Sequence, residues 1–374
     1  MRNRTAATTL RKRVLIIPGV TRHRPRNSSL GSAVGSPFYP ALPAVQVAAV
    51  SASLSTWAGL DLTSFPTTPR SSVSFSHRTC FATTRRAGPT STPPSSCTMA
   101  TTAEQQAQLV ETSKRLAAFQ AVKDYLKPEY TRIGIGSGST VVYVVEAIAA
   151  LGPAVTSTMA FYPTGAQSEE LIEAAGLRLQ YISKLPADQQ LDVAFDGADE
   201  VDDDLNLIKG GGACLWQEKI VAASARQFVC VADFRKLSSR LGTAWKKGIP
   251  IEVLPMAAPR VLGELRRLGS LDPCIRPGLP GKAGACVTDN GMWIIDAPFP
   301  PLLLSGDAEA AAADPRPVGT WTVDELADRL IKIPGVAEIG LFYGKNGLQV
   351  ASGAQKPVAA YFGMADGTVT VKTA

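Results

Sequence analysis

Short apolar runs alternate with longer amphipathic segments between about residues 101 and 243. The first segment repeats apolar residues with a helical period and stops before Pro128, and Thr101–Glu104 resembles a capping box, so a helix is predicted to begin there. The strands predicted after it are Thr131–Ile135, Val155–Phe161, Arg178–Ile182, Leu191–Phe195 and Gln227–Ala232, and the helices between them are 139–151, 165–175 and 213–225. Alternation of this kind predicts an α/β fold with a parallel sheet.

Beyond Gly242 the pattern changes to that of an α+β unit with hairpins. Asp289-Asn290-Gly291 is typical of a tight turn between strands, and Pro298–Gly319, rich in Pro and Ala, is interpreted as a surface insertion. The strands predicted here are 249–254, 285–288, 292–296, 338–343, 348–351 and 368–371, and the helices are 258–268 and 323–331.

Charge is distributed very unevenly. Residues 1–100 hold 12 of the 38 Lys and Arg residues and a single acid, Asp61, whereas the remainder has 26 basic and 31 acidic residues. The basic, Ser/Thr-rich segment 1–100 is predicted to be a transit peptide, and its composition favours the chloroplast stroma. The alternative is translation from Met99, which would leave a cytoplasmic protein. The acidic remainder gives no support to nucleic-acid binding.

The chain lacks both a long apolar run and closely paired cysteines. No run of about 18 apolar residues is present, so no membrane span is predicted. The six cysteines show no C-x-x-C spacing, which favours free thiols in a reducing compartment.

Histidine is confined to the first hundred residues, at His23 and His77. A Ser-His-Asp hydrolase, a Cys-His protease and a His-ligated zinc site are therefore excluded from the rest of the chain. Proton transfer near neutral pH must use a perturbed Glu, Asp, Lys, Cys or Tyr, or a group of the substrate.

A glycine-rich loop, Gly134–Thr140, follows the first predicted strand. Its amides, the following helix N-terminus and the hydroxyl groups suit a phosphate monoester, although such a loop can also serve only as a packing turn. It lacks the lysine of a nucleoside-triphosphate loop, and the next strand ends without the acid that binds a ribose, so both nucleotide interpretations are poor.

Three more loops at strand ends carry charged residues. Asp196–Asp202 is acidic; it is either a solvated turn, a Mg²⁺ site or part of an active site near a lysine. Lys209 precedes three glycines whose amides could face an oxyanion. Glu218 lies on an apolar helix face, where it either turns to solvent or is buried as a base. Asp233–Lys236 offers a cation to a phosphate or hydroxyl.

Taken together, these residues resemble ribose-5-phosphate isomerase, type A, in family order over about residues 102–374. The most specific stretches are Asp196–Glu200 and Lys209–Gly212 followed by Glu218. The further matching stretches are Gly134–Thr140, Pro163-Thr164, Asn206–Ile208, Glu218–Val221, Asp233 with Lys236, Pro250–Pro255, Thr288–Gly291 and Ile333–Val336.

The resemblance implies a Rossmann-like catalytic domain of residues 101–243, completed by about 345–374. It also implies a smaller α+β, ferredoxin-like domain of residues 244–344. It further implies a homodimer without metal or cofactor that interconverts ribose 5-phosphate and ribulose 5-phosphate, in the pentose phosphate pathway and, in a plastid, the Calvin cycle.

The resemblance also assigns roles to residues. Glu218 becomes the base that moves a proton between C2 and C1 through an enediolate. Asp196 and Asp199 act on sugar hydroxyls and ring opening, and Lys209 stabilises the oxyanion. The substrate-binding residues are Ser137, Gly138, Ser139, Thr140, Gly197, Ala198, Gly210, Gly211, Gly212 and Lys236. Departures from the family pattern include Phe234-Arg235 before Lys236, and Ile339 where a histidine is common.

Two rival functions fit the fold. One is a non-catalytic sugar-phosphate sensor, against which the joint presence of Glu218, Asp196 and Lys209 argues. The other is an acyl-CoA transferase with a glutamate nucleophile, which the phosphate-type loop and the lysines fit less well.

Overall fold

The computed structural model describes residues 98–312 and 315–374. The predicted transit peptide therefore lies outside the described residues, except for its last three positions. All the described residues belong to one compact unit, Pro89–Ala374. Helix α1 (Thr98–Tyr125) runs through the predicted capping box, so the expectation that the helix begins there is wrong. In this part of the chain no helix combines the length and apolar character that a membrane crossing requires.

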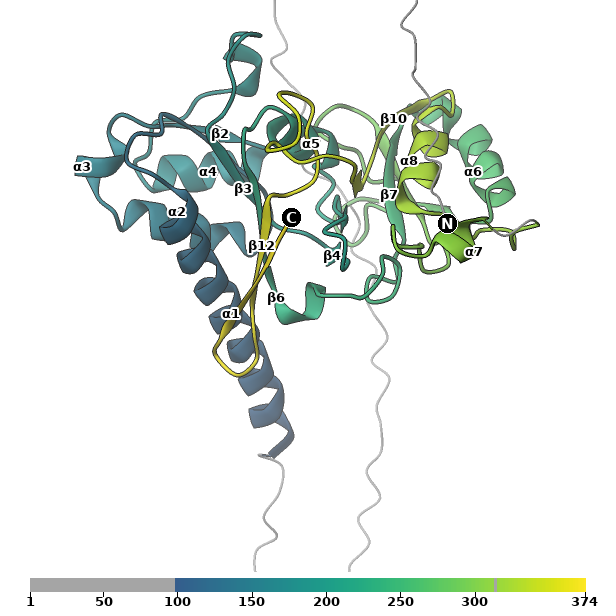
Figure 1. Ribbon diagram of the computed structural model, residues 1–374, viewed down its shortest axis with the longest axis horizontal. Helices are drawn as coiled ribbons and strands as arrows, with labels where there is room; N and C mark the ends of the chain where they lie inside the picture. Colours follow the sequence, from purple (N-terminus) through teal and green to yellow (C-terminus); the bar gives the residue numbers. More distant parts are fainter. Residues whose placement is uncertain (1–97, 313–314) are drawn as a thin grey trace, which may run out of the picture. The chain divides into compact units, whose positions relative to one another are not determined.

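A six-stranded sheet forms the centre of the larger domain (Figure 1). Five neighbouring strands are parallel, and the sixth, at one edge, is antiparallel to its neighbour. The strands, in their order across the sheet, are β13 (Val369–Thr373), β12 (Ala359–Gly363), β6 (Phe228–Asp233), β3 (Val193–Asp196), β1 (Arg132–Ile135) and β2 (Ala160–Pro163).

Both faces of this sheet are covered, which explains why its strands are continuous apolar runs rather than alternating ones. Strand β3 shows the consequence: Val193 and Phe195 pack into the core beneath α1, α2 and α4, and Ala194 faces the core beneath α5. The remaining helices of this domain are α2 (Val141–Ala149), α3 (Pro153–Thr156), α4 (Ala166–Ala174) and α5 (Leu215–Ala223).

Strand order reverses between β1 and β3, because β2 lies on one side of β1 and the later strands lie on the other. At such a switch point the loops leaving the carboxyl ends of the two strands diverge and open a crevice. The loops after β1 and β3 begin at Gly136 and Gly197, so the fold itself brings the glycine-rich loop and the acidic loop together.

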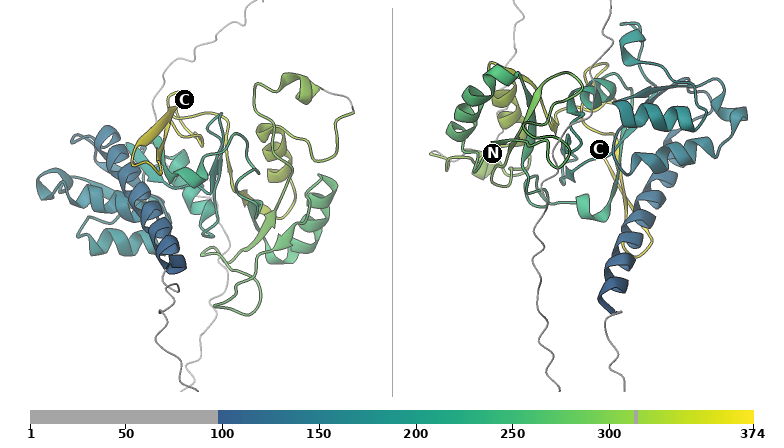
Figure 2. Two further views of the ribbon diagram at one scale, coloured as in Figure 1. Left: turned by 90° about the horizontal axis from the view of Figure 1, so that it is seen from below. Right: turned by 180° about the vertical axis from the view of Figure 1, so that it is seen from behind.

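The smaller domain is a four-stranded antiparallel sheet with two helices on one face (Figure 2). Its elements follow in a β-α-β-β-α-β order, and the strand order is β10-β7-β9-β8, which is the ferredoxin-like arrangement expected from the resemblance. The elements are β7 (Ile249–Val253), α6 (Ala258–Arg267), β8 (Cys274–Ile275), β9 (Trp293–Ala297), α8 (Val323–Ile331) and β10 (Val336–Ile339).

A third, three-stranded sheet connects the two domains. It consists of β4 (Glu200–Val201), β5 (Leu207–Ile208) and β11 (Leu341–Phe342). The sequence predicts a single strand over 338–343, but the chain leaves one sheet and enters another at Gly340. A Cβ atom there would lie 2.3 Å from the carbonyl oxygen of Lys209, so the close approach of the two segments requires glycine.

Several predicted strands are shorter in the structure or are not strands. Val155 and Thr156 lie in α3 because Pro153 starts a helical turn, and the strand begins only at Ala160. The predicted strands 178–182, 285–288 and 348–351 reduce to isolated bridges or turns.

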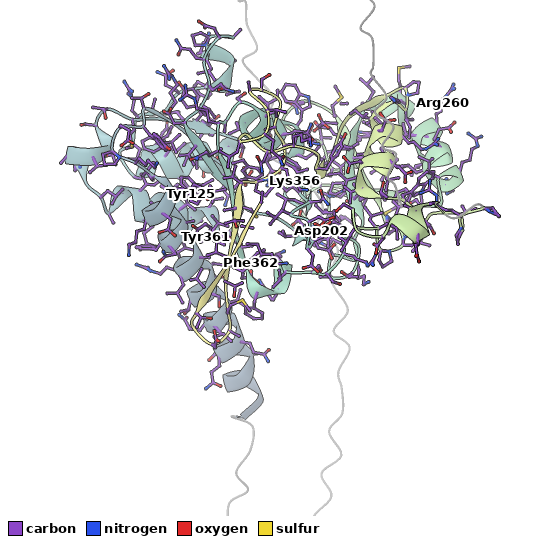
Figure 3. All side chains as sticks on the ribbon, viewed as in Figure 1. Tyr125, Asp202, Arg260, Lys356, Tyr361 and Phe362 are labelled. Atoms are coloured by element: carbon purple, nitrogen blue, oxygen red, sulfur yellow. The ribbon has the colours of Figure 1, made fainter. Side chains whose placement is uncertain are left out.

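Strand β12, in contrast, is not predicted. It is anchored to α1, since the Tyr361 hydroxyl donates to Asp124 Oδ2 at 2.9 Å and its ring meets Tyr125 edge-on at 6.0 Å (Figure 3).

The segment 298–319 is only partly a surface insertion. Phe299 and Leu302 are buried in the core of the smaller domain, and α7 (Ala308–Ala312) follows on the outside. The proline content conceals this anchoring, because Pro300 and Pro301 separate the two buried side chains.

Candidate active site

A cavity of about 270 Å³ lies where the switch-point loops meet. All the site residues predicted from the sequence line this cavity except Asp196. Asp196 lies outside the lining and forms an ion pair with Lys209, which does line it. The lining residues are Ser137, Gly138, Ser139, Thr140, Gln167, Gly197, Ala198, Asp199, Lys209, Gly210, Gly211, Gly212, Cys214, Glu218, Asp233, Arg235 and Lys236.

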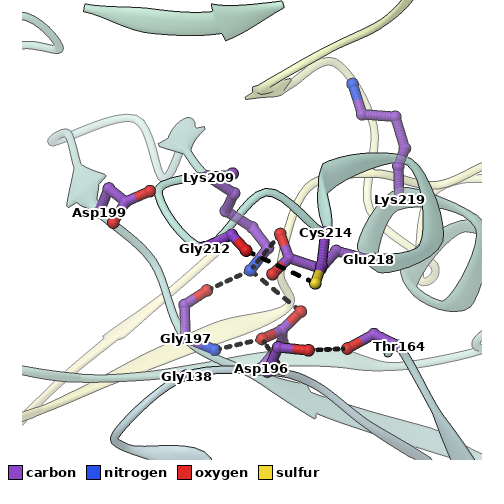
Figure 4. Close-up of polar contacts among 12 residues, drawn as sticks. Gly138, Thr164, Asp196, Gly197, Asp199, Lys209, Gly212, Cys214, Glu218 and Lys219 are labelled. Atoms are coloured by element: carbon purple, nitrogen blue, oxygen red, sulfur yellow. Dashed lines mark hydrogen bonds and ion pairs between the residues drawn. The ribbon is translucent and has the colours of Figure 1, made fainter. Parts of the chain in front are cut away.

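Lys209 joins the acidic loop to the helix that carries Glu218 (Figure 4). Its Nζ atom lies 3.0 Å from Asp196 Oδ2 and 3.3 Å from Glu218 Oε2, and all three side chains are buried. Nζ also donates to the Gly197 carbonyl oxygen at 2.6 Å. Burial lowers the pKa of the ammonium, but the two carboxylates reverse this and raise the pKa above its usual value. The lysine therefore stays charged.

Asp196 is fixed by backbone amides on its other side. Its Oδ1 atom accepts from Ser137 N at 3.1 Å and from Gly197 N at 2.7 Å. A Cβ atom on Gly136 would lie 2.0 Å from that oxygen, so only glycine allows the loop after β1 to approach the carboxylate. Burial raises the pKa of Asp196, whereas Lys209 and the two amides lower it. Burial outweighs these donors, and the pKa of Asp196 is raised above its usual value.

Glu218 lies in the first turn of α5 and faces the cavity, so of the two alternatives left open by the sequence the buried one holds. Its Oε2 atom has no hydrogen-bond donor among the described residues, although Lys209 lies within ion-pair distance. Burial raises the pKa of Glu218 to about 7, with further upward contributions from Asp196 and Asp199, against the lowering effect of Lys209. A carboxylate in this state can accept and return a proton near neutral pH.

The three glycines after Lys209 curve around Asp199. The Asp199 Oδ2 atom accepts from Gly211 N at 2.6 Å, and a Cβ atom on Gly211 would come within 2.6 Å of the carboxylate. One of the amides expected to face an oxyanion is therefore already bound to Asp199. The Gly212 residue is exposed on the cavity wall, and nothing lies within 4 Å of its Cβ direction.

The glycine-rich loop after β1 supplies the other wall. The Ser137 hydroxyl lies 2.6 Å from the Thr164 hydroxyl, which fixes the loop to the end of β2. The Gly138 amide donates to Gln167 Oε1 at 2.8 Å, and helix α2 begins two residues beyond Ser139. Loop amides and a helix N-terminus together form an arrangement that binds anions.

Cations from the loop after β6 complete the lining. Lys236 lies over the Trp245 ring, with Nζ 5.3 Å from its centroid. Arg235, not assigned a role from the sequence, forms a two-point ion pair with Asp233, with Nε 2.7 Å from Oδ1. Burial raises the pKa of the Asp233 carboxyl, but Arg235 overcomes this, and the pKa is lowered.

The other acids of the segment 196–202 serve the scaffold. Glu200 is completely buried and accepts from Ser238 and from the amides of Gly242 and Thr243, which fixes the following loop. Asp202 binds the backbone and side chain of Asn206. Within the described residues no group of three or more His, Cys, Asp and Glu side chains is placed to hold a metal ion.

Comparisons with known proteins show the family of this chain. The family model of ribose 5-phosphate isomerase A (phosphoriboisomerase A) matches residues 160–356, more than half of the 374-residue chain. The chain belongs to the ribose 5-phosphate isomerase A family.

Ribose-5-phosphate isomerases from fungi are similar over most of their length. The one from Mycosarcoma maydis is 49% identical over 71% of this chain and 82% of its own. The one from Schizosaccharomyces pombe is 47% identical over 71% of this chain and 84% of its own.

Solved structures of the ribose-5-phosphate isomerase family also share the fold. A D-ribose-5-phosphate isomerase in complex with phospho-erythronic acid is 32% identical, with a TM-score of 0.58 over 71% of this chain and 99% of its own. Ribose 5-phosphate isomerase A from Methanocaldococcus jannaschii is 31% identical, with a TM-score of 0.55 over 70% of this chain and 98% of its own.

Besides Asp233 and Arg235, two uncharged cavity residues of this member of the isomerase family are not expected from the sequence. Gln167 lies one residue inside α4, and Cys214 immediately precedes α5. Neither carries a charge, and although Cys214 ends the loop after β5, a lone thiol gives no distinct signal, so only their positions beside Gly138 and Glu218 distinguish them. Burial raises the pKa of the Cys214 thiol to about 11, which keeps it protonated.

Proposed function

We propose that this chain interconverts D-ribose 5-phosphate and D-ribulose 5-phosphate by moving one proton between C2 and C1, with Glu218 as the base. The observation that carries the proposal is the buried contact of Lys209 with both Asp196 and Glu218, at the wall of a cavity whose opposite side is an anion-binding loop. A carboxylate base, a cation and free amides are what an enediolate intermediate requires.

Binding begins at the phosphate. The amides and hydroxyls of Ser137–Thr140 hold the phosphate group beside the N-terminus of α2, and Lys236 adds positive charge at the rim. The Gly138 amide, which donates to Gln167 Oε1 in the structure, gives up this hydrogen bond and donates to a phosphate oxygen instead. The sugar chain then extends past Gly197 and Ala198 toward Glu218.

Ring opening and proton transfer follow at the other end of the cavity. Asp199, on the cavity wall, takes the proton of the C1 hydroxyl as the ring opens, and this proton passes to the ring oxygen, while Asp196 holds the Lys209 ammonium in place. Glu218 then removes the C2 proton and returns it to C1, and the O2 hydroxyl proton passes to O1, while the Lys209 ammonium and the amides of the loop Gly210–Gly212 stabilise the negative oxygen. Gly212 is the amide best placed for this, since Gly211 donates to Asp199.

The assay that tests the proposal uses the full chain with ribose 5-phosphate after treatment with EDTA. Ribulose 5-phosphate should form at an undiminished rate, because each step uses side chains and amides of the protein. Loss of activity that added metal restores would return the acidic loop to consideration as a metal site. No turnover with or without metal would contradict the proposed function.

We further propose that the protein is a homodimer that acts in the pentose phosphate pathway and, in the chloroplast stroma, in the Calvin cycle. The basic, Ser/Thr-rich segment 1–100 supports the plastid assignment. Sequencing of the N-terminus of the native protein should find it near residue 100, and sedimentation should give twice the chain mass. A mature protein that retains the segment would contradict the targeting assignment.

A further inference from the structure

The guanidinium of Arg276 reaches from the smaller domain to the glycine loop of the cavity. Arg276 directly follows β8, and its Nη1 atom donates to the carbonyl oxygens of Gly210 at 2.9 Å and Gly211 at 3.2 Å. Its side chain is 13% exposed and does not itself line the cavity. It therefore touches the outer side of the loop whose inner side faces the substrate space.

Arg276 is in turn held by Asp296 on β9. Nε lies 2.9 Å from Asp296 Oδ2, and Nη2 lies 2.5 Å from Oδ1, a two-point contact that fixes the plane of the guanidinium. The backbone is fixed as well, because Arg276 N donates to Ile294 O at 2.8 Å and Arg276 O accepts from Cys286 N at 2.8 Å. The arginine is thus a rigid part of the smaller sheet.

Because peptides are planar, the hydrogen bonds from Arg276 to the Gly210 and Gly211 carbonyls also fix the directions of the Gly211 and Gly212 N–H groups. In a trans peptide the C=O of one residue and the N–H of the next point in opposite directions. When Arg276 holds the Gly210 carbonyl, the Gly211 N–H must point away from it, and it does so toward Asp199 Oδ2 at 2.6 Å. The same relation directs the Gly212 N–H away from Arg276.

The loop needs such support because its backbone is strained. Gly210 has a φ of +98° and Ala213 a φ of +66°, and the second of these is unfavourable for a residue with a side chain. Gly210, Gly211 and Gly212 have no side chains that could pack and hold the loop, so the peptide groups that join them could rotate. A charge-assisted hydrogen bond to each carbonyl also polarises the peptide, which makes its N–H a stronger donor.

We propose that Arg276, held by Asp296, is a positioning residue that directs the Gly211 amide to Asp199 and the Gly212 amide into the cavity and thereby supports oxyanion stabilisation by Gly212, an inference that rests on the proposed isomerase function. The smaller domain then contributes to the reaction through this arginine. Lys209 and Glu218 remain the groups that touch the reacting atoms.

The test is the variant Arg276→Met, measured for kcat, KM and the binding of two ligands. We expect kcat to fall at least about tenfold with KM within about threefold, since the amides act mainly on the intermediate. Phospho-erythronic acid carries a carboxylate in place of the negative enediolate oxygens, so its binding should weaken by a similar factor. Binding of inorganic phosphate should be unchanged.

Two further variants distinguish a positioning role of Arg276 from a contribution to the stability of the fold alone. Arg240→Met removes another two-point arginine–aspartate pair, that with Asp307, and should leave kcat unchanged. Arg276→Lys should recover part of the lost kcat, because an ammonium can bind the carbonyls without the full contact to Asp296. If Arg276→Met does not fold, Asp296→Asn and Arg276→Lys should still show the split between kcat and KM.

Three results would overturn the inference: an unchanged kcat in the folded variants, an equal loss in Arg240→Met, or equal weakening of both ligands. Failure of the proposed function would look different, because the unaltered chain would then not isomerise ribose 5-phosphate at all.

Discussion

The Lys209 ammonium nitrogen lies 3.3 Å from Glu218 Oε2, with both side chains almost completely buried. Lys209 thus forms ion pairs with two carboxylates, because Asp196 Oδ2 also lies 3.0 Å from its nitrogen. Asp196 has two amide donors in addition, whereas Glu218 Oε2 has none among the described residues. Glu218 also lines the cavity and Asp196 does not, so Glu218 is the carboxylate placed to exchange a proton with the substrate.

The pH dependence of kcat/KM should therefore show an acidic limb near pH 7. The pKa of Glu218 is raised to about 7, so below that pH the base is protonated and the rate should fall tenfold for each pH unit. A stopped assay from pH 5 to 9 measures this limb. A rate that stays flat down to pH 5 would contradict the assignment.

Asp199→Asn should move this limb to lower pH. Asp199 is among the negative charges that raise the pKa of Glu218, and the amide removes that charge. Maximal activity should also fall, because Asp199 is proposed to act in ring opening. The phosphate group of the substrate ionises near pH 6 as well, but a substitution in the protein cannot move that ionisation. An unmoved limb would therefore assign it to the substrate.

Lys209→Met should reduce the free energy of unfolding by about 3–5 kcal/mol, because two buried carboxylates lose their cation. The deficit should be smaller at pH 5 than at pH 8. Burial already raises the folded-state pKa of both carboxyls, and removing the ammonium raises them further. Stability from such groups is present below their unfolded pKa and is lost as pH rises through the folded pKa.

Urea unfolding at both pH values measures the effect of Lys209→Met. The control is Lys332→Met, which removes an exposed pair with Asp328 and should cost less than about 1 kcal/mol at either pH. A deficit for Lys209→Met that is equal at the two pH values would contradict the linkage.

Gly136→Ala should lower kcat about 10²-fold, because the new Cβ would meet Asp196 Oδ1 at 2.0 Å and must displace the carboxylate from Lys209. The matched control is Gly263→Ala in α6, where nothing lies within 4 Å of the added atom. That variant should keep its activity and gain roughly 0.5–1 kcal/mol of stability. Normal turnover in Gly136→Ala would show that the site tolerates movement of Asp196.

Much of this arrangement could be predicted from the sequence, because the main strands are apolar runs that end in unusual residues. Glu218 illustrates the limit: its apolar helix face allowed two orientations, and only packing against Lys209 selects one. Strand β12 was missed because Ala359 and Ala360 give no strand signal, and the strand is determined by pairing with β6. Arg276 and Gln167 depend on contacts between distant segments, which no local pattern reveals.

The most direct test of the account is the fate of the C2 hydrogen in Glu218→Gln. Ribose 5-phosphate deuterated at C2 is incubated in water with the variant, and ¹H NMR follows both isomerisation and loss of the label. We expect substrate binding to persist while both processes slow by about 10²-fold or more, with Glu173→Gln, an exposed glutamate of α4, behaving as the unaltered chain. Isomerisation and label loss at normal rates in Glu218→Gln would contradict the claim that this carboxylate carries the proton.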